Sequence, residues 1–147
     1  MTRLVARPDS CPEWIRDTIL RLDQLCFPAD WRVRVEGCYW WIEEQDREPV
    51  AYAALRPCLA RHNAGLGFLS RVGVLRDWRG QGRQKRLIRR RVAHARRIGL
   101  KELVTYVVPS NLASANSLIA CGFRLYSPRH AWGGRTALHF RRVLRGN

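Results

Sequence analysis

The stretch from Gly65 to Ile98 constrains the fold more than any other part of this chain. It passes from a strand-like apolar run, "GLGFLSRVGVL", through "RDWRGQGRQK" to a segment with apolar residues at helical spacing. A strand that ends in a glycine turn and opens a helix exposes backbone N–H groups at the helix N-terminus, where the helix dipole adds positive charge. Such a terminus binds phosphate. The sequence therefore predicts an anion site at the turn that contains Gly80 and Gly82.

The residue types in this turn fit close contact with an anion. Glycines let the backbone approach without Cβ obstruction, and Arg79, Arg83 and Lys85 add charge-assisted contacts. The turn is neither G-x-x-x-x-G-K-[ST] nor G-x-G-x-x-G, so nucleoside triphosphates and dinucleotides are disfavoured as ligands. Taken alone, two glycines beside arginines fit a tight solvated turn equally well. A second segment is needed to decide.

Periodicity along the rest of the chain predicts alternating strands and helices. Ser10 is the expected N-cap of a helix over residues 12–25, and Gly99 is the expected stop of a helix that begins at Gln84. A further helix is expected over 112–120, and strands over 3–6, 38–42, 50–55, 65–75, 102–108, 123–127 and 136–144. The charged segment "EEQDRE" connects two of these strands, and "PRHAWGGR" is expected to be a loop.

These elements indicate an α/β or α+β protein with a mixed sheet. A length of 147 residues fits one domain over residues 1–147. The N-terminus lacks the apolar region of a signal peptide, and no apolar run approaches a membrane span, so we expect a cytoplasmic protein. Five cysteines without a C-x-x-C pair and four histidines without ligand spacing predict no metal site.

A second motif lies in "VVPSNLASANSLIACGF". It places Asn111 in a turn after a strand, Ser114 near a helix start, and Gly122 and Phe123 at the helix end. With Val74, Arg79 and Gly82 of the glycine turn, these positions resemble the GNAT N-acetyltransferase superfamily. Its coenzyme loop reads [RQ]-x-x-G-x-[GA] and its later motif resembles N-x-x-[AS]-x-x-x-x-x-x-x-G-F. "LCFPADW" and "PVAYAAL" extend the resemblance over most of the chain.

The resemblance implies a mixed central sheet of six to seven strands with about four helices, splayed between strands four and five to admit acetyl-CoA. The backbone of the fourth strand would pair with pantetheine like an added strand. The implied coenzyme contacts are Val72, Gly73, Val74, Arg79, Gly80, Gln81, Gly82, Arg83, Gln84, Lys85, Asn111, Ser114 and Asn116. Two departures from the pattern stand out, because Gln84 replaces the usual Gly or Ala and Arg76 replaces a common proline. For Asn111 and Ser114, helix capping is the alternative role.

The catalytic groups of many relatives are missing at the matching positions. Tyr106 stands at the position of a fifth-strand glutamate, Phe68 at a fourth-strand carboxylate, and Leu118 at the acid tyrosine. Three readings stay open: catalysis by positioning with a backbone N–H near Val74 and bulk water, use of an unusual group, or binding of acetyl-CoA without turnover. The candidate unusual groups are Tyr106, Ser117, Tyr126 and Cys121, and Tyr106 is the catalytic residue we predict. A core tyrosine is the alternative for that position.

The implied function is transfer of an acetyl group from acetyl-CoA to a primary amine on a protein or peptide, an aminoacyl-tRNA or a small molecule. The net charge of +15 and the eight basic residues from Arg83 to Arg97 also fit a polyanionic partner, such as RNA, a nucleic-acid-associated protein or an acidic peptide. The alternatives are a solvated basic face, or a nucleic-acid-associated protein that keeps the fold and binds CoA without turnover. The acceptor and the oligomeric state cannot be read from the sequence.

Overall fold

The structure, a computed structural model, describes residues 1–144 of the chain. Its seven strands follow the order β1-β2-β3-β4-β5-β7-β6, and the mixed sheet of six to seven strands that the resemblance implies is confirmed. The strands are β1 (Thr2–Ala6), β2 (Tyr39–Gln45), β3 (Glu48–Pro57), β4 (Leu66–Val74), β5 (Glu102–Val107), β6 (Arg124–Tyr126) and β7 (Leu138–Val143). The α-helices of residues 1–144 are α1 (Glu13–Cys26), α2 (Arg83–Arg97) and α3 (Leu112–Ala120). Short 3₁₀ turns lie at Arg61–Asn63 and Arg76–Trp78.

The chain divides into two compact units. Unit 1 comprises Met1–Arg56 and Ser70–Leu87, and unit 2 comprises Pro57–Leu69 and the chain from Ile88 onward. Strand β4 and helix α2 each contribute residues to both units.

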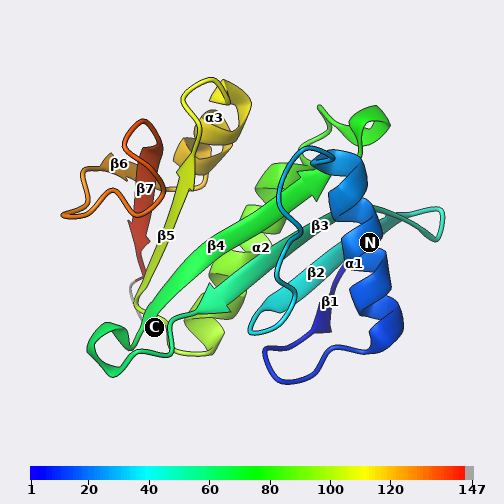
Figure 1. The fold of residues 1–147 in the computed structure, drawn as a ribbon, viewed down its shortest axis with the longest axis horizontal. Coiled ribbons are helices and arrows are strands. Elements are labelled where there is room, and N and C mark those ends of the chain that lie inside the picture. The colour runs from blue at the N-terminus through cyan, green and yellow to red at the C-terminus, as the bar shows by residue number, and fades with distance from the viewer. Residues whose placement is uncertain (145–147) are drawn as a thin grey trace. The chain divides into compact units, whose positions relative to one another are not determined.

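In unit 1, helix α1 covers one face of strands β1 to β3 (Figure 1). Its buried residues Ile15, Ile19 and Leu22 belong to one apolar core with Trp40 and Tyr52 of the strands. Burial of side chains of this size provides most of the stabilisation of such a layer. The two tryptophans of β2, Trp40 and Trp41, are both buried, so neither of them lines a pocket.

The β2–β3 hairpin is tighter than the sequence predicts. Asp46 and Arg47 form its loop with positive φ angles of 51° and 67°, the geometry of a two-residue turn that matches strand twist. Most of the charged segment "EEQDRE" therefore lies in the strands, not in a connection. The physical reason is Glu43, whose side chain is buried and paired with arginines from α2.

The start of α1 also differs from the prediction. Pro12 occupies the N-cap position without a side-chain cap, and Ser10 instead forms a bridge with Arg7, with backbone N–H···O distances of 2.9 and 3.1 Å. The prediction of Ser10 as N-cap was wrong, because the backbone N–H and carbonyl of Ser10 are both hydrogen-bonded to Arg7. A proline at the cap needs no N–H partner.

Unit 2 contains β5, β7 and β6 as antiparallel neighbours (Figure 1). The parallel ladder between β4 and β5 joins Leu66–Phe68 to Glu102–Val104, and the Thr105 hydroxyl donates to the Leu69 carbonyl at 2.8 Å. Helix α3 ends at Ala120, and Gly122 follows its C-cap with a φ of 87°, which is favourable for glycine. The predicted positions of α3 and of the loop before β7 are confirmed.

Candidate functional site

The segment between β4 and α2 forms the glycine loop, defined here as Leu75–Gly82. After the 3₁₀ turn, Gly80 and Gly82 adopt φ angles of 78° and 79°, a region that L side chains rarely enter. The Gly82 carbonyl accepts from the Arg86 N–H at 3.1 Å and so starts helix α2. A Cβ at Gly80 would meet open space, and the first turn of α2 carries no acidic residue. The residues present therefore fit a diphosphate at this terminus.

Arg83, the first residue of α2, does not face solvent. Its side chain is 6% exposed, and Nε lies 2.6 Å from Oε2 of the buried Glu43, as an ion pair without the alignment of a hydrogen bond. Its Nη1 donates to the Trp78 carbonyl at 3.0 Å and also to the Gln81 side chain, and Nη2 donates to Gln45 at 3.2 Å. Arg83 is therefore not part of a solvated basic face of this helix. Any contact of this residue with an anion rests on its backbone N–H.

Glu43 is the acceptor at the centre of this cluster. Thr2 donates to its Oε1 at 2.8 Å, and Arg86 reaches both carboxylate oxygens, at 3.3 and 3.0 Å. Burial raises the pKa of the Glu43 carboxyl, but hydrogen bonds from Arg86 and Thr2 and the charges of Arg86 and Arg83 lower it to a net value below the ordinary one. Glu43 is therefore ionised at neutral pH and balances the buried guanidinium.

The end of β4 holds the other coenzyme positions of unit 1. The Arg79 Nε donates to the Val74 carbonyl at 2.9 Å, which ties the loop to the strand end. Gly73 lies against Tyr52, since a Cβ there would sit 2.5 Å from the ring. Tyr52 is itself fixed by a 2.5 Å hydrogen bond from its hydroxyl to the buried Asp23, and burial with this partner raises its pKa. Of the remaining predicted contacts, Val72 and Gln84 are half-buried, and Gln81 and Lys85 are exposed.

The predicted residues of the second motif lie in unit 2. Asn111 caps α3, because its side-chain oxygen accepts from the Ser114 N–H at 3.2 Å. Ser114 is buried, whereas Asn116 is exposed on the helix. The geometry thus supplies a capping role for Asn111, which leaves a coenzyme contact as a separate prediction.

An aromatic cluster surrounds Tyr106 in unit 2. Trp132 packs edge-on against Tyr106 and Phe68, with ring centroids 5.3 and 5.5 Å apart, and lies 5.4 Å from His139. Its indole N–H donates to the Tyr126 hydroxyl at 3.2 Å. Tyr106 is 47% exposed, so it is not a core residue. We call Phe68, Tyr106, Tyr126, Trp132 and His139 the aromatic cluster.

The loop that carries Trp132 is fixed through one glycine. Gly133 donates its N–H to Nε2 of the buried His139 at 3.1 Å, and a Cβ on Gly133 would lie 2.3 Å from the Tyr106 ring. An acceptor Nε2 places the imidazole proton on Nδ1 when the ring is neutral. The sequence did not predict that these residues surround Tyr106, because nothing in it distinguishes His139 from an ordinary strand residue.

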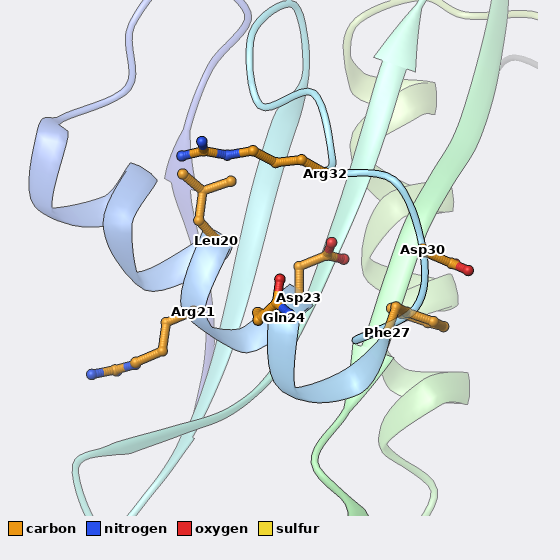
Figure 2. A pocket seen from close by; sticks show the side chains of 7 residues that line it. All are labelled: Leu20, Arg21, Asp23, Gln24, Phe27, Asp30 and Arg32. Atoms are coloured by element: carbon orange, nitrogen blue, oxygen red, sulfur yellow. The ribbon is translucent and has the colours of Figure 1, made fainter.

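A pocket of about 350 Å³ lies elsewhere in unit 1, between the last turns of α1 and the segment that follows it (Figure 2). Phe27 and Asp30 point to the same side of this segment, and Arg21 points away from them. Arg71 of β4 donates to Asp23 and Asp30 at 2.8 and 3.0 Å and stacks over the Phe27 ring at 4.1 Å. The residues that line the pocket carry both signs of charge, because Asp23 and Asp30 lie there with Arg21 and Arg32. Sequence reasoning missed this network because its members are far apart in the chain.

Helix α2 presents its remaining basic residues to solvent. Arg83 and Arg91 are buried, and burial lowers the pKa of Arg91 to about 9. The exposed basic residues of α2 are Lys85, Arg86, Arg89, Arg90, Arg96 and Arg97. In the described part of the chain, no helix has the length and apolarity to cross a membrane. Residues 1–144 contain no group of three His, Cys, Asp or Glu residues arranged to hold a metal.

Comparison with known proteins decides the family. Residues 7–123 match the acetyltransferase (GNAT) family, which is most of the chain. The chain belongs to this family. As a GNAT protein it is an acyl-CoA N-acyltransferase, and the resemblance noted from Val74, Arg79, Gly82 and the Asn111 motif is confirmed. A comparison with curated proteins gave no match.

Solved structures agree with the GNAT fold. The ribosomal-protein-alanine N-acetyltransferase from Brucella melitensis is 20% identical with a TM-score of 0.74, over 98% of this chain and 99% of that one. The ribosomal-protein-S18-alanine N-acetyltransferase from Escherichia coli is 17% identical with a TM-score of 0.73, over 97% and 94%. YncA from Salmonella typhimurium, solved with its cofactor acetyl-CoA, is 18% identical with a TM-score of 0.74, over 100% and 95%. At these identities the likeness concerns the fold.

Proposed function

We propose that this GNAT protein transfers an acetyl group from acetyl-CoA to a primary amine, and that the glycine loop with the start of α2 binds the diphosphate of the coenzyme. The observation that carries the proposal is the pair of positive-φ glycines at an N-terminus without acidic residues. The presence of acetyl-CoA in the YncA structure supports the choice of ligand. We also propose that residues 1–147 form one catalytic domain, which the family match across both units supports.

The coenzyme contacts proposed from the family pattern fall into two groups. The first group is Val72, Gly73, Val74, Arg79, Gly80, Gln81, Gly82, Arg83, Gln84 and Lys85. The second group is Asn111, Ser114 and Asn116. In the first group, Arg79 and Lys85 supply side-chain charge and Arg83 a backbone N–H. Backbone groups of β4 would align the pantetheine arm.

Acetyl transfer requires a neutral amine, stabilisation of the oxyanion and a proton for the leaving thiolate. Placement of the two substrates provides much of the acceleration by proximity. We propose that the hydroxyl of Tyr106 supplies the proton to the thiolate. Its exposed position in the aromatic cluster supports this role over that of a core residue.

Two glycines at opposite ends of α2 allow a matched test of the diphosphate site. Gly82 and Gly99 have φ angles of 79° and 85°, and a Cβ at either residue would find space. Alanine at either position should therefore cost a similar amount of stability, roughly 1–2 kcal/mol. We expect Gly82→Ala to weaken CoA binding in calorimetry at near-physiological salt, and Gly99→Ala to leave it unchanged. Equal binding by the two variants, or a wild-type protein that fails to bind CoA at millimolar concentration, would refute the proposal.

The acceptor needs its own experiment. A thiol-release assay with small amines, lysine peptides, peptides with an N-terminal alanine and aminoacylated tRNA covers the proposed classes. The two ribosomal-protein-alanine acetyltransferases among similar folds are the reason to include the alanine peptide. CoA binding without thiol release on any acceptor would favour the alternative, a basic nucleic-acid-associated protein without turnover. The cytoplasmic location stays a prediction.

We further propose that the exposed basic face of α2 attracts a polyanionic partner. Arg89, Arg90, Arg96 and Arg97 are all exposed, and the apolar residues Leu87, Ile88 and Val92 of the helix are buried. Because the apolar face is buried, only the charged face of this helix is available to a partner, and it would attract anions through charge. The expected sign of such binding is a strong decrease of affinity with salt.

A further inference from the structure

Arg83, paired with the buried Glu43, contacts two residues of the glycine loop, and the exposed Arg86 donates to the Gln81 carbonyl at 3.3 Å. One guanidinium donates to the Trp78 carbonyl and to the Gln81 side chain, while its Nε faces Glu43. These loop contacts lie on either side of Gly80. A planar guanidinium with five donors can make such contacts at once, which an ammonium cannot.

The loop has reason to need such an anchor. Gly80 and Gly82 carry no side chains that could restrict the backbone, and glycine loses more conformational freedom on ordering than any other residue. A diphosphate site made of backbone N–H groups binds well only if these groups are already arranged. An anchor that orders the loop before binding removes that cost from the binding step.

Stability alone does not account for the pair. Two buried charges lose their hydration, and apolar residues of similar volume in their place are often as stable or more stable. What apolar residues cannot replace is the set of donors aimed at Trp78 and Gln81. Glu43 faces both Arg83 and Arg86, so its single negative charge offsets one of the two guanidinium charges.

We propose that Arg83 is a positioning residue, held by the buried Glu43, which orders the glycine loop for the coenzyme diphosphate without contacting it through its side chain. This inference rests on the proposed function of the loop. It adds a role to an arginine that the sequence assigned to direct contact with the ligand.

The test uses the double variant Glu43→Leu/Arg83→Leu, which keeps the net charge and hence the long-range field. We expect it to remain folded, with a thermal midpoint near that of the wild type, and to bind CoA about tenfold more weakly because the loop is no longer ordered. In steady-state kinetics the KM for acetyl-CoA should rise while kcat at saturating coenzyme stays within about twofold. Arg61→Leu, an exposed arginine outside α2, is the control and should change neither the CoA affinity nor the KM for acetyl-CoA.

A second variant keeps the test decisive if the double variant does not fold. Arg83→Lys retains a charge beside Glu43 but cannot reach the Trp78 carbonyl and Gln81 together, so it should also weaken CoA binding. Wild-type affinity in the folded double variant, or in Arg83→Lys if the double variant unfolds, overturns the positioning role. If the wild-type protein itself does not bind CoA in the same titration, the proposed function fails and this inference fails with it.

Discussion

The glycine loop of unit 1 and the aromatic cluster of unit 2 are built in different ways. The loop comes from one continuous stretch, and its anchor is a buried ion pair with donors at 3.0 and 3.2 Å. The cluster is assembled from β4, β5, β6, β7 and the segment before β7, and it is held by ring contacts and by a half-exposed tyrosine. The contacts of the loop are hydrogen bonds and an ion pair between buried groups, whereas those of the cluster are ring contacts that include the exposed side chains of Tyr106 and Trp132.

The largest effect should come from breaking the ion pair on one side only. Glu43→Gln leaves Arg83 buried without a counter-charge, and we expect a loss of about 3–5 kcal/mol in the free energy of unfolding at pH 7. The pKa of Glu43 is lowered in the folded state, so its contribution is present above the unfolded pKa of about 4.3 and is lost as pH falls through the lower folded value. Urea denaturation from pH 7 to pH 3 should therefore show the two proteins converging in acid. A difference that is constant with pH would contradict this account.

The next effect compares two glycines that each lie against a tyrosine. Alanine at Gly73 would place Cβ 2.5 Å from the ring of the fully buried Tyr52, and we expect a loss on the order of 1–3 kcal/mol. Alanine at Gly133 would place Cβ 2.3 Å from Tyr106, which is exposed and lies beside a loop, so the stability loss should be smaller. Thermal unfolding of both variants measures this order. If Gly133→Ala is less stable than Gly73→Ala, the surroundings of Tyr106 yield to an added Cβ no more easily than those of Tyr52, and the expected order is wrong.

A change in rate should separate the chemistry of the cluster from its packing. Tyr106→Phe keeps the ring that contacts Trp132 and removes the hydroxyl, so turnover should fall at least several-fold if that hydroxyl transfers a proton. The thermal midpoint and CoA affinity should stay near wild type. Tyr39→Phe, which removes a tyrosine hydroxyl from β2 of unit 1, is the control and should leave turnover unchanged. Unchanged turnover in Tyr106→Phe would leave catalysis to positioning and the backbone.

The smallest effect should come from the exposed arginines of α2. Arg89→Gln/Arg90→Gln should weaken binding to RNA modestly and reduce the slope of log affinity against log salt by about 2, one for each lost phosphate contact. CoA affinity should not change, because the glycine loop is untouched. RNA binding that is insensitive to this substitution would show that the face is only a solvated surface.

The sequence predicted the parts of this protein that depend on neighbours in the chain. Gly80, Gly82 and the start of α2 form a local pattern, and the same is true of Asn111 as a cap. The cross-strand contact of His139 with Gly133, and the reach of Arg83 to Glu43, depend on which strands become neighbours. No periodicity reports such contacts. Glu43 lies in a charged run and is therefore expected to be exposed; only the position of helix α2, which supplies Arg83 and Arg86, explains its burial.

Gly133 gives the segment before β7 two attachments through a single backbone position, its N–H on His139 and its Cα against Tyr106. Neither attachment requires the side chains of the exposed neighbours Arg129, His130, Ala131, Gly134, Arg135 or Thr136. These residues can therefore be randomised together while Trp132 and Gly133 are retained. The segment is therefore a site for library design, because its residues can be changed without rebuilding the strands that carry Tyr106 and His139.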